Sequence, residues 1–252
     1  MPKQAPPATG PGPVLVAVAH GSTDPRASAT VAELADLVRR RRPGLDLRTA
    51  FLGHAPPSLP QVLGTIEAGR EIRVMPLLLT AAYHSKADIP RMLARVPQPV
   101  SYGATLGPHP LLITALERRL AQADPAVLAD PAQTAVVLAA AGSSDPEANA
   151  TIAGLAARWQ AQAGWRAVRP AYASAAGPTP AEAVTALLEG GAAQVVVATY
   201  LLAPGLFADK IADAALAAGA AAVSPALGAC PEVADVLLDR FGEARSRRAT
   251  AA

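Results

Sequence analysis

The chain has 252 residues, and 51% of them are apolar, so it can build one or two folded cores and is not a disordered chain as a whole. Its 22 basic and 20 acidic residues nearly cancel, which argues against a protein that binds nucleic acid electrostatically. Its single cysteine, Cys230, excludes a disulfide framework or a cysteine-based metal cluster within one chain, as is typical of a reducing compartment.

The N-terminal residues 1–13 are rich in proline and lack the apolar core of a signal peptide. No apolar run in the chain reaches the length of a membrane span. We therefore expect a disordered lead-in over 1–13, no membrane partner and a cytoplasmic protein.

The first half of the chain alternates between short apolar runs and segments with helical spacing of apolar residues. The runs predict buried parallel strands at 14–19, 45–52, 72–79 and 100–106. Start and stop signals predict helices at about 25–42, 58–69, 88–96 and 109–122. This alternation predicts right-handed crossovers and a parallel sheet covered by helices on both faces. The basic run 39–42 ends the first helix, and we interpret it as a solvated helix end rather than a phosphate-binding patch.

The second half of the chain repeats the first at a constant offset of 121 residues, as from Gly21 to Gly142. Further landmarks keep this offset in order: Ser22 with Ser143, Asp24 with Asp145, Phe51 with Tyr172, Pro57 with Pro178, Asp88 with Asp209, Leu106 with Leu227, Pro110 with Pro231 and Arg119 with Arg240. The sequence therefore predicts two tandem α/β/α units, each with a four-stranded parallel sheet flanked by helices. We place the first unit at 14–124, its degenerate repeat at 132–243, and a disordered tail at 244–252. The first unit is also where we expect a metal site, from the histidines described next.

All four histidines of the chain lie in the first unit. The second unit has small residues or cysteine at the equivalent positions: Ala141 for His20, Ala175 for His54, Gly205 for His84 and Cys230 for His109. The fold is thus expected in both units, and the metal-binding groups only in the first.

His20 directly follows the first strand, and His84 lies in the loop after the third. In a sheet with strand order 2-1-3-4 these strands are neighbours at the switch point, where a ligand crevice opens. Two neutral imidazoles that converge there suit a divalent ion such as iron, cobalt, nickel or zinc. The alternative is that both histidines bind loop backbone, but their joint loss from the second unit favours the metal. His54 follows the second strand and is a candidate third ligand. The sequence favours this role and its absence equally.

Other polar residues near these strand ends have structural alternatives. The pair Gly21-Ser22 suits an anion at a helix N-terminus, but its recurrence as Gly142-Ser143 favours a turn. Asp24 and Asp88 recur without the histidines, so we predict that they cap helices. His109 opens a helix, which favours a structural start over a ligand.

Polar residues that flank the two central histidines are predicted to contact a bound substrate: Ser22, Tyr83, Ser85 and Lys86. Lys86 is suited to pairing with substrate carboxylates, and the alternative is a solvated surface charge.

The sequence resembles the sirohydrochlorin chelatases of siroheme and cobalamin biosynthesis, which have the class II chelatase fold. The resemblance covers both units and rests on a set of motifs: Ala19–Arg26 (AHGSTDPR), Phe51-Leu52 with Pro57-Ser58, Met75–Leu79 (MPLLL), Tyr83-His84 with Asp88–Pro90, and Leu106–Pro110 (LGPHP). The combination of His-Gly-Ser with the later His and Asp-Ile-Pro is specific, although no single motif is.

The resemblance implies a lyase that inserts Fe2+ or Co2+ into sirohydrochlorin, with the metal as a substrate and no permanently bound cofactor. It implies that His20 and His84 hold the ion and accept protons from the macrocycle, two tasks that neutral imidazole can perform near pH 7. Family members often carry a carboxylate where this chain has Gly53, so either His54 replaces it or two histidines and water suffice. Cations at the cleft rim are expected to face the substrate's carboxylates, the candidates being Arg26, Lys86, Arg91 and Lys210.

Two alternatives stay open. A protein that carries a metal or a tetrapyrrole without turnover fits the missing carboxylate at Gly53. A hydrolase with Ser22 activated by His20 is disfavoured because the chain lacks a Gly-x-Ser-x-Gly elbow. We expect a monomer or weak homodimer whose partners are a divalent metal and sirohydrochlorin or a related tetrapyrrole.

Overall fold

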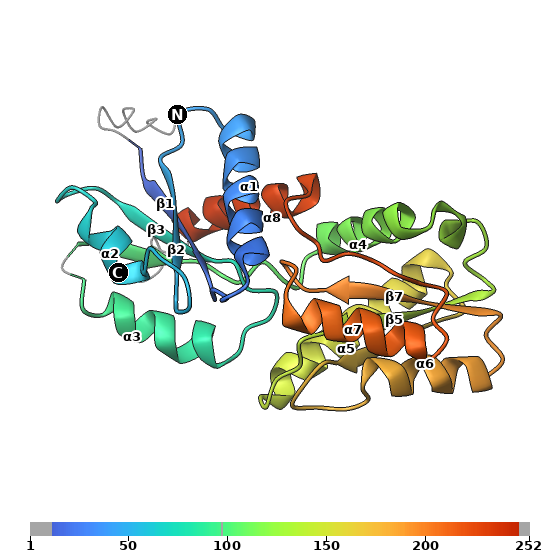
Figure 1. Cartoon of the computed structure of the whole chain (residues 1–252). Helices are drawn as coiled ribbons and strands as arrows, with labels where there is room; N and C mark the ends of the chain where they lie inside the picture. Colours follow the sequence, from blue (N-terminus) through green and yellow to red (C-terminus); the bar gives the residue numbers. More distant parts are fainter. Residues whose placement is uncertain (1–11, 97, 247–252) are drawn as a thin grey trace.

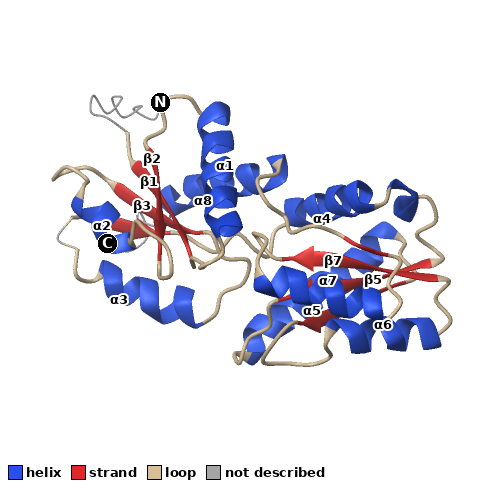
Figure 2. Cartoon of the chain, in the orientation of Figure 1, coloured by secondary structure: helices blue, strands red, loops and turns tan. Residues whose placement is uncertain are grey.

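The computed structural model describes residues 12–96 and 98–246, which form two lobes, each built on a four-stranded parallel sheet (Figures 1 and 2). The first sheet has the order β2-β1-β3-β4 and the second the equivalent order β6-β5-β7-β8. The predicted fold class and the predicted strand order are therefore confirmed, and the expected lead-in over 1–13 falls almost wholly outside the described residues.

The strands of the two sheets are β1 Val14–Ala19, β2 Leu47–Phe51, β3 Ile72–Pro76 and β4 Val100–Tyr102, then β5 Thr134–Ala140, β6 Ala167–Tyr172, β7 Gln194–Tyr200 and β8 Ala222–Val223. The α-helices are α1 Pro25–Arg41, α2 Leu59–Gly64, α3 Ile89–Leu93, α4 Pro110–Ala123, α5 Pro146–Ala163, α6 Pro180–Glu189, α7 Leu206–Ala217 and α8 Pro231–Ser246. A π-helix, η1 His84–Asp88, precedes α3, and a 3-10 helix, η2 Pro125–Leu128, follows α4.

Alternate residues of the central strands face opposite layers, as a doubly covered parallel sheet requires. In β1, Val14, Val16 and Val18 pack with α2 and α3, whereas Leu15 and Ala17 pack with α1 and α8. The second lobe has α6 and α7 on one face of its sheet and α4 and α5 on the other.

The helix that ends each sequence repeat packs on the other lobe. α8 contacts α1, β3 and β4 of the first sheet, while α4 contacts β7 and β8 of the second, and the two helices contact each other. Arg119 in α4 donates through Nε to the Leu227 oxygen at 2.8 Å, and Arg240 in α8 donates to the Thr105 oxygen at 3.0 Å. The two arginines are equivalent under the repeat, and Arg240 also donates to the Leu106 oxygen, the counterpart of the Leu227 oxygen, at 3.5 Å. The boundary between the lobes in space thus differs from the boundary between repeats along the chain.

The basic run at the end of α1 is exposed, and two of its arginines also contact α8. Arg41 pairs with Asp235 in α8 at 2.7 Å, and the Arg42 guanidinium lies 5.3 Å from the centre of the Phe241 ring. The interpretation of this run as a solvated helix end is therefore confirmed, and the exchanged helix α8 gives two of its arginines a partner at that end.

Several element ends differ from the predicted ones. α2 ends at Gly64 rather than 69, because the chain tightens into i→i+3 turns and the Thr65 hydroxyl donates to the Val62 oxygen at 2.7 Å. The disordered tail predicted over 244–252 is wrong for 244–246, since α8 continues to Ser246 and Ala244 is buried. Residues 247–252 lie outside the described residues.

The two aspartates predicted as helix caps behave differently. The Asp24 carboxylate accepts from the Arg26 backbone N–H at 2.9 Å, which confirms the cap of α1. Asp88 makes no capping hydrogen bond, and that prediction is wrong because η1 runs directly into α3, so the backbone is already helical at Asp88. Within the described residues, no helix is both long enough and apolar enough to span a bilayer.

Candidate functional site

The turn after β1 brings His20 to the carboxyl edge of the first sheet with an exposed side chain. Gly21 follows at φ +89°, and a Cβ there would collide with the Gly53 carbonyl group, so only glycine fits. Gly53 donates its backbone N–H to the His20 oxygen at 3.1 Å, and the second lobe repeats this with Ser174 and Ala141 at 3.0 Å. The turn is therefore scaffold, and the histidine is what distinguishes the first lobe.

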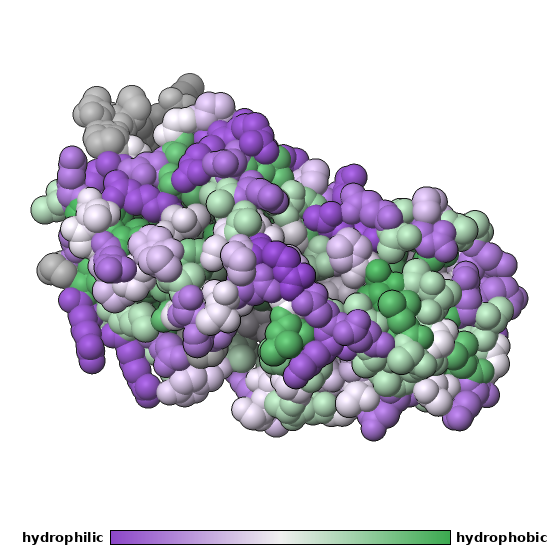
Figure 3. Space-filling model, viewed as in Figure 1, coloured by the Kyte–Doolittle hydropathy of each residue, from purple (hydrophilic) through white to green (hydrophobic). Residues whose placement is uncertain are grey.

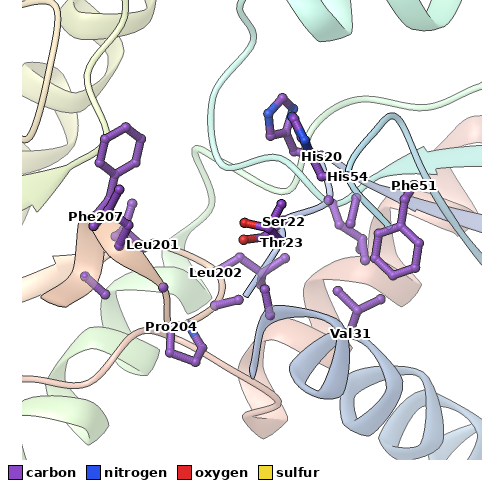
Figure 4. Close-up of a pocket in the computed structure, with 18 residues that line it drawn as sticks. His20, Ser22, Thr23, Val31, Phe51, His54, Leu201, Leu202, Pro204 and Phe207 are labelled. Carbon is purple, nitrogen blue, oxygen red and sulfur yellow. The ribbon is translucent and has the colours of Figure 1, made fainter. Parts of the chain in front are cut away.

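His54 lies beside His20. Their ring centres are 6.1 Å apart and their planes are inclined by 56°. His54 has a left-handed backbone, with φ +61°, and its counterpart Ala175 has φ +59°. The backbone conformation thus belongs to the fold, and only the first lobe uses it to carry an imidazole next to His20 (Figure 4).

The segment that contains His84 follows β3, the strand next to β1. Leu77 donates to the Val18 oxygen at 2.8 Å, so the chain leaves β3 alongside the end of β1. The backbone of His84 begins η1, and its side chain lies outside the described part of the structure. In the second lobe the equivalent segment, from Gly205 into α7, is an ordinary α-helix. The two copies therefore differ in backbone structure at the position of His84.

Two cavities, of about 450 and 330 Å3, flank His20 between the lobes. The two cavities share five of their lining residues: His20, Leu77, Leu201, Leu202 and Phe207. In Figure 4, Phe207 and Leu201 lie on the wall across from His20 and His54. The first lobe thus supplies the imidazoles of this cleft, and the second lobe supplies an apolar wall.

The apolar wall continues to the surface. The Leu206 side chain is 66% exposed and Phe207 is 42% exposed, and these residues stand where the first unit has Ser85 and Lys86. In Figure 3, apolar groups lie next to hydrophilic ones where the two lobes meet. Our sequence reasoning missed this wall because it followed polar residues, although two large apolar residues at the start of a helix after Pro204-Gly205 were a detectable signal.

Both serines predicted to contact substrate hold the local backbone. The Ser22 hydroxyl accepts from the Asp24 N–H at 3.0 Å, as Ser143 does from Asp145. Ser85 is buried, and its hydroxyl both donates to and accepts from the Ala82 backbone, at 2.9 and 3.0 Å. Both serines still line the cavities.

Tyr83 is 59% exposed, and its hydroxyl accepts from Arg91 at 3.2 Å. Neither residue lines the two cavities around His20.

Lys86 reaches across to the second lobe. Its Nζ lies 2.7 Å from Glu147 and 2.9 Å from Asp145. The hydrogen bonds that Lys86 donates to Glu147 and Asp145 raise the pKa of Lys86, and the one to Asp145 lowers the pKa of that carboxyl. Lys86 is therefore an ion-paired bridge between lobes and not an unpaired rim charge.

Arg26 forms a second bridge between the lobes. Its guanidinium lies 2.6 Å from Asp24 in its own lobe and 2.6 Å from Asp209 in α7. The side-chain hydrogen bond with Arg26 lowers the pKa of Asp24. Both carboxylates thus pair with one arginine.

His109 lies away from this cleft and starts α4. Its Nδ1 accepts the Leu111 N–H at 3.2 Å, which confirms the structural role favoured by the sequence. Burial, together with the nearby Arg240, lowers the pKa of His109 and so favours the neutral imidazole that accepts this hydrogen bond.

Among the described side chains, no three histidine, cysteine or carboxylate groups converge as a metal site. The described donors at the cleft are the imidazoles of His20 and His54, and the side chain of His84 is outside that set. At the position after Phe51-Leu52, Gly53 contributes only backbone, which packs against Gly21.

Comparisons with known proteins agree with this architecture. The sequence profile of the CbiX family matches residues 14–123 and again 135–244. A sirohydrochlorin cobaltochelatase of Priestia megaterium is 25% identical over 207 residues, which are 78% of this chain and 66% of that protein. A sirohydrochlorin ferrochelatase of Bacillus subtilis is 31% identical over 162 residues, 58% of this chain and 60% of that protein. The matched regions thus span less than two thirds of these two relatives.

A solved structure of SirB from Bacillus subtilis with Fe3+ has a TM-score of 0.80 and 26% identity, and the match covers 95% of this chain and 98% of that one. A SirB structure in complex with cobalt, at 24% identity and a TM-score of 0.77, has the same fold. Since the CbiX profile matches both repeats over most of the sequence, this chain belongs to the CbiX family.

Proposed function

We propose that this protein is a sirohydrochlorin chelatase that inserts Fe2+ or Co2+ into a macrocycle bound between its two lobes. The family, and the curated relatives named for cobalt and iron insertion into sirohydrochlorin, support this activity. The observation that carries it here is the cleft: imidazoles stand at the end of β1 and beside it, and the second lobe has none at equivalent positions.

In this proposal His20 and His84 bind the incoming ion from the ends of neighbouring strands. The proposal for His84 is supported by the π-helix that starts at this residue, since such turns occur often at functional sites. His54 is the candidate for a third ligand because its ring is next to that of His20 and Gly53 offers no side chain. Imidazole nitrogen suits both iron and cobalt.

Metal insertion replaces two pyrrole N–H protons of the tetrapyrrole with one divalent ion, so the site must accept two protons as the ion leaves the protein. Each histidine that releases the metal regains a lone pair and can then take up one proton. Two imidazole ligands therefore balance the reaction without another base. The metal is a substrate, and no resident cofactor is required.

In this proposal the macrocycle binds against the apolar wall of the second lobe. Leu201, Leu202 and Phe207 lie opposite His20 and would pack against the flat face of a tetrapyrrole while the metal approaches from the other side. Stacking and burial of apolar ring surface supply the binding energy. Since one chain supplies both walls of the cleft, a monomer suffices.

The test is an anaerobic assay with sirohydrochlorin and Fe2+ or Co2+, followed by the change in absorbance as the metal enters the ring. We expect many turnovers per protein molecule at a rate well above that without protein. Stoichiometric binding of metal or tetrapyrrole without acceleration would instead support a carrier protein. An unchanged rate with every divalent metal would reject the chelatase proposal.

A further inference from the structure

The two ion-pair clusters between the lobes occupy equivalent positions with reversed charges. One joins the start of α1 to the start of α7, through Arg26 and Asp209. The other joins the start of α5 to η1, through Glu147 and Lys86. Under the 121-residue offset α1 corresponds to α5, and η1 corresponds to the first residues of α7. The cation is thus on the first lobe in both clusters, and the bridging carboxylate is on the second.

Each cluster borders one end of the cleft. The first cavity is lined by residues that adjoin the Arg26 cluster in sequence, among them Thr23, Ala27 and Ala208. The second is lined by residues that adjoin the Lys86 cluster, among them Ser85 and Ala148. His20 lines both cavities and so lies between the two clusters.

In both clusters the cation and the carboxylate nearest to it on the second lobe are exposed, whereas an ion pair at the exchanged helices has a buried carboxylate. The side chains of Arg26 and Asp209 are 51% and 49% exposed, and that of Glu147 is 82% exposed. Arg118 and Glu232, which join α4 to α8, are 2.6 Å apart with the Glu232 side chain only 8% exposed. Exposed ion pairs contribute little to stability and exchange partners readily, whereas a buried charge must keep its partner. The lobes are therefore tied permanently at the exchanged helices and only weakly at the cleft.

We propose that Arg26 and Lys86 are carboxylate receptors for the tetrapyrrole, and that carboxylates of the second lobe occupy them until the substrate displaces those carboxylates. This inference rests on the proposed function. The substrate carries many carboxylates on its perimeter, the same chemical group that Asp209, Asp145 and Glu147 present. Binding then exchanges substrate carboxylates for those of the second lobe, one on Arg26 and two on Lys86, which conserves the number of ion pairs and frees the second lobe to move around the macrocycle.

The exchange and a purely structural ion pair predict different effects on ligand binding when either partner is substituted. If Asp209 competes with the ligand for Arg26, removing the carboxylate strengthens ligand binding and removing the arginine weakens it. If the pair only holds the lobes together, both substitutions act in the same direction. The two partners of one ion pair are thus expected to give effects of opposite sign.

The experiment measures the dissociation constant of metal-free uroporphyrin, an octacarboxylate porphyrin, by fluorescence titration of the full chain. We expect Asp209→Asn to tighten binding about two- to fivefold, the range for loss of an exposed ion pair. We expect Arg26→Gln to weaken it about tenfold or more, the range for a lost charged hydrogen bond. Glu147→Gln and Lys86→Gln repeat the comparison at the other cluster.

The matched control is Asp235→Asn, which breaks the exposed pair with Arg41 away from the cleft and should leave uroporphyrin binding unchanged. Thermal melting confirms that each variant is folded. Effects of the same sign within both clusters, or a change as large in Asp235→Asn, would overturn the exchange and leave the chelatase proposal standing. No binding of uroporphyrin by the unmodified protein would also overturn the exchange, whereas the chelatase proposal is decided separately by the insertion assay with sirohydrochlorin.

Discussion

Arg240 in the last helix of the second repeat donates through Nε to the main-chain oxygen of Thr105 in the first, at 3.0 Å. Its counterpart Arg119, in the last helix of the first repeat, donates in the other direction to the main-chain oxygen of Leu227 in the second. One hydrophobic cluster runs through both exchanged helices and joins the two sheets. The cleft is thus placed between lobes that complete each other's cores.

This exchange predicts that the first repeat does not fold alone. A fragment of residues 1–124 lacks α8, and its own α4 belongs on the other sheet, so one face of its sheet stays uncovered. We expect the fragment to lack a cooperative unfolding transition as a monomer, as checked by circular dichroism and size-exclusion chromatography. A monomeric fragment with a sharp transition would show that α8 is dispensable.

The position of Phe241 allows a test of the same exchange within the full chain. Its side chain is 1% exposed, and the guanidinium groups of Arg42 and Arg73 lie 5.3 and 4.9 Å from its ring centre. Phe241→Ala should lower the free energy of unfolding by about 3–5 kcal/mol, the range for a buried aromatic residue. Leu216→Ala, at a side chain that is 53% exposed, is the control and should cost about 0.5 kcal/mol or less. Equal losses in urea denaturation would argue that α8 does not contribute to the core.

The glycine turns after β1 and β5 should be equally intolerant of a side chain. Gly21 has φ +89° and Gly142 has φ +83°, and in each a Cβ would collide with a carbonyl group of the neighbouring loop. Alanine at either position should destabilise the protein by about 1–3 kcal/mol from backbone strain. Thermal melts of Gly21→Ala and Gly142→Ala measure the loss of stability in each variant. A loss of stability in Gly21→Ala alone would contradict a scaffold role shared by the two turns.

The pH dependence of stability should have a component from His109. Burial and Arg240 lower its pKa, while Asp239 and Glu243 raise it, and the net pKa is lower than usual. The pKa of His109 in the folded state lies below its unfolded value of about 6.5. The neutral imidazole therefore contributes to the free energy of unfolding above that pH, and this contribution is lost as the pH falls through the folded-state pKa. His109→Asn keeps a capping side chain without the titration. Its free energy of unfolding should therefore decline less between pH 7 and 5, and parallel declines in the two proteins would exclude this role.

The sequence was sufficient to predict the sheet order and the two repeats because buried parallel strands leave continuous apolar runs, and turns such as Gly21-Ser22 recur at one offset. It did not predict which sheet α4 and α8 cover, since an apolar helix face specifies burial but not the partner. Arg119 and Arg240 matched in the repeat, yet their acceptors are backbone atoms that carry no sequence signal.

The candidate site was also predicted only in part, because contacts between distant parts of the chain leave no signal in the local sequence. His20 and the segment of His84 follow neighbouring strands, so local pattern and topology together placed them. The pairing of Arg26 with Asp209 joins residues 183 positions apart, and nothing local indicates it. Asp88 looked like a helix cap, but the π-helix before it removes the helix start that a cap requires.

The central claim is that imidazoles of the first lobe transfer the metal, and His20→Ala tests it most directly. The measurement is the rate of Co2+ insertion into sirohydrochlorin by the variant, with His109→Asn as a control histidine outside the cleft. Since His20 is exposed and alanine occupies its counterpart position 141, the variant should remain folded and lose most of the acceleration, while His109→Asn keeps it. Insertion by a folded His20→Ala variant at the rate of the unmodified protein would contradict the account.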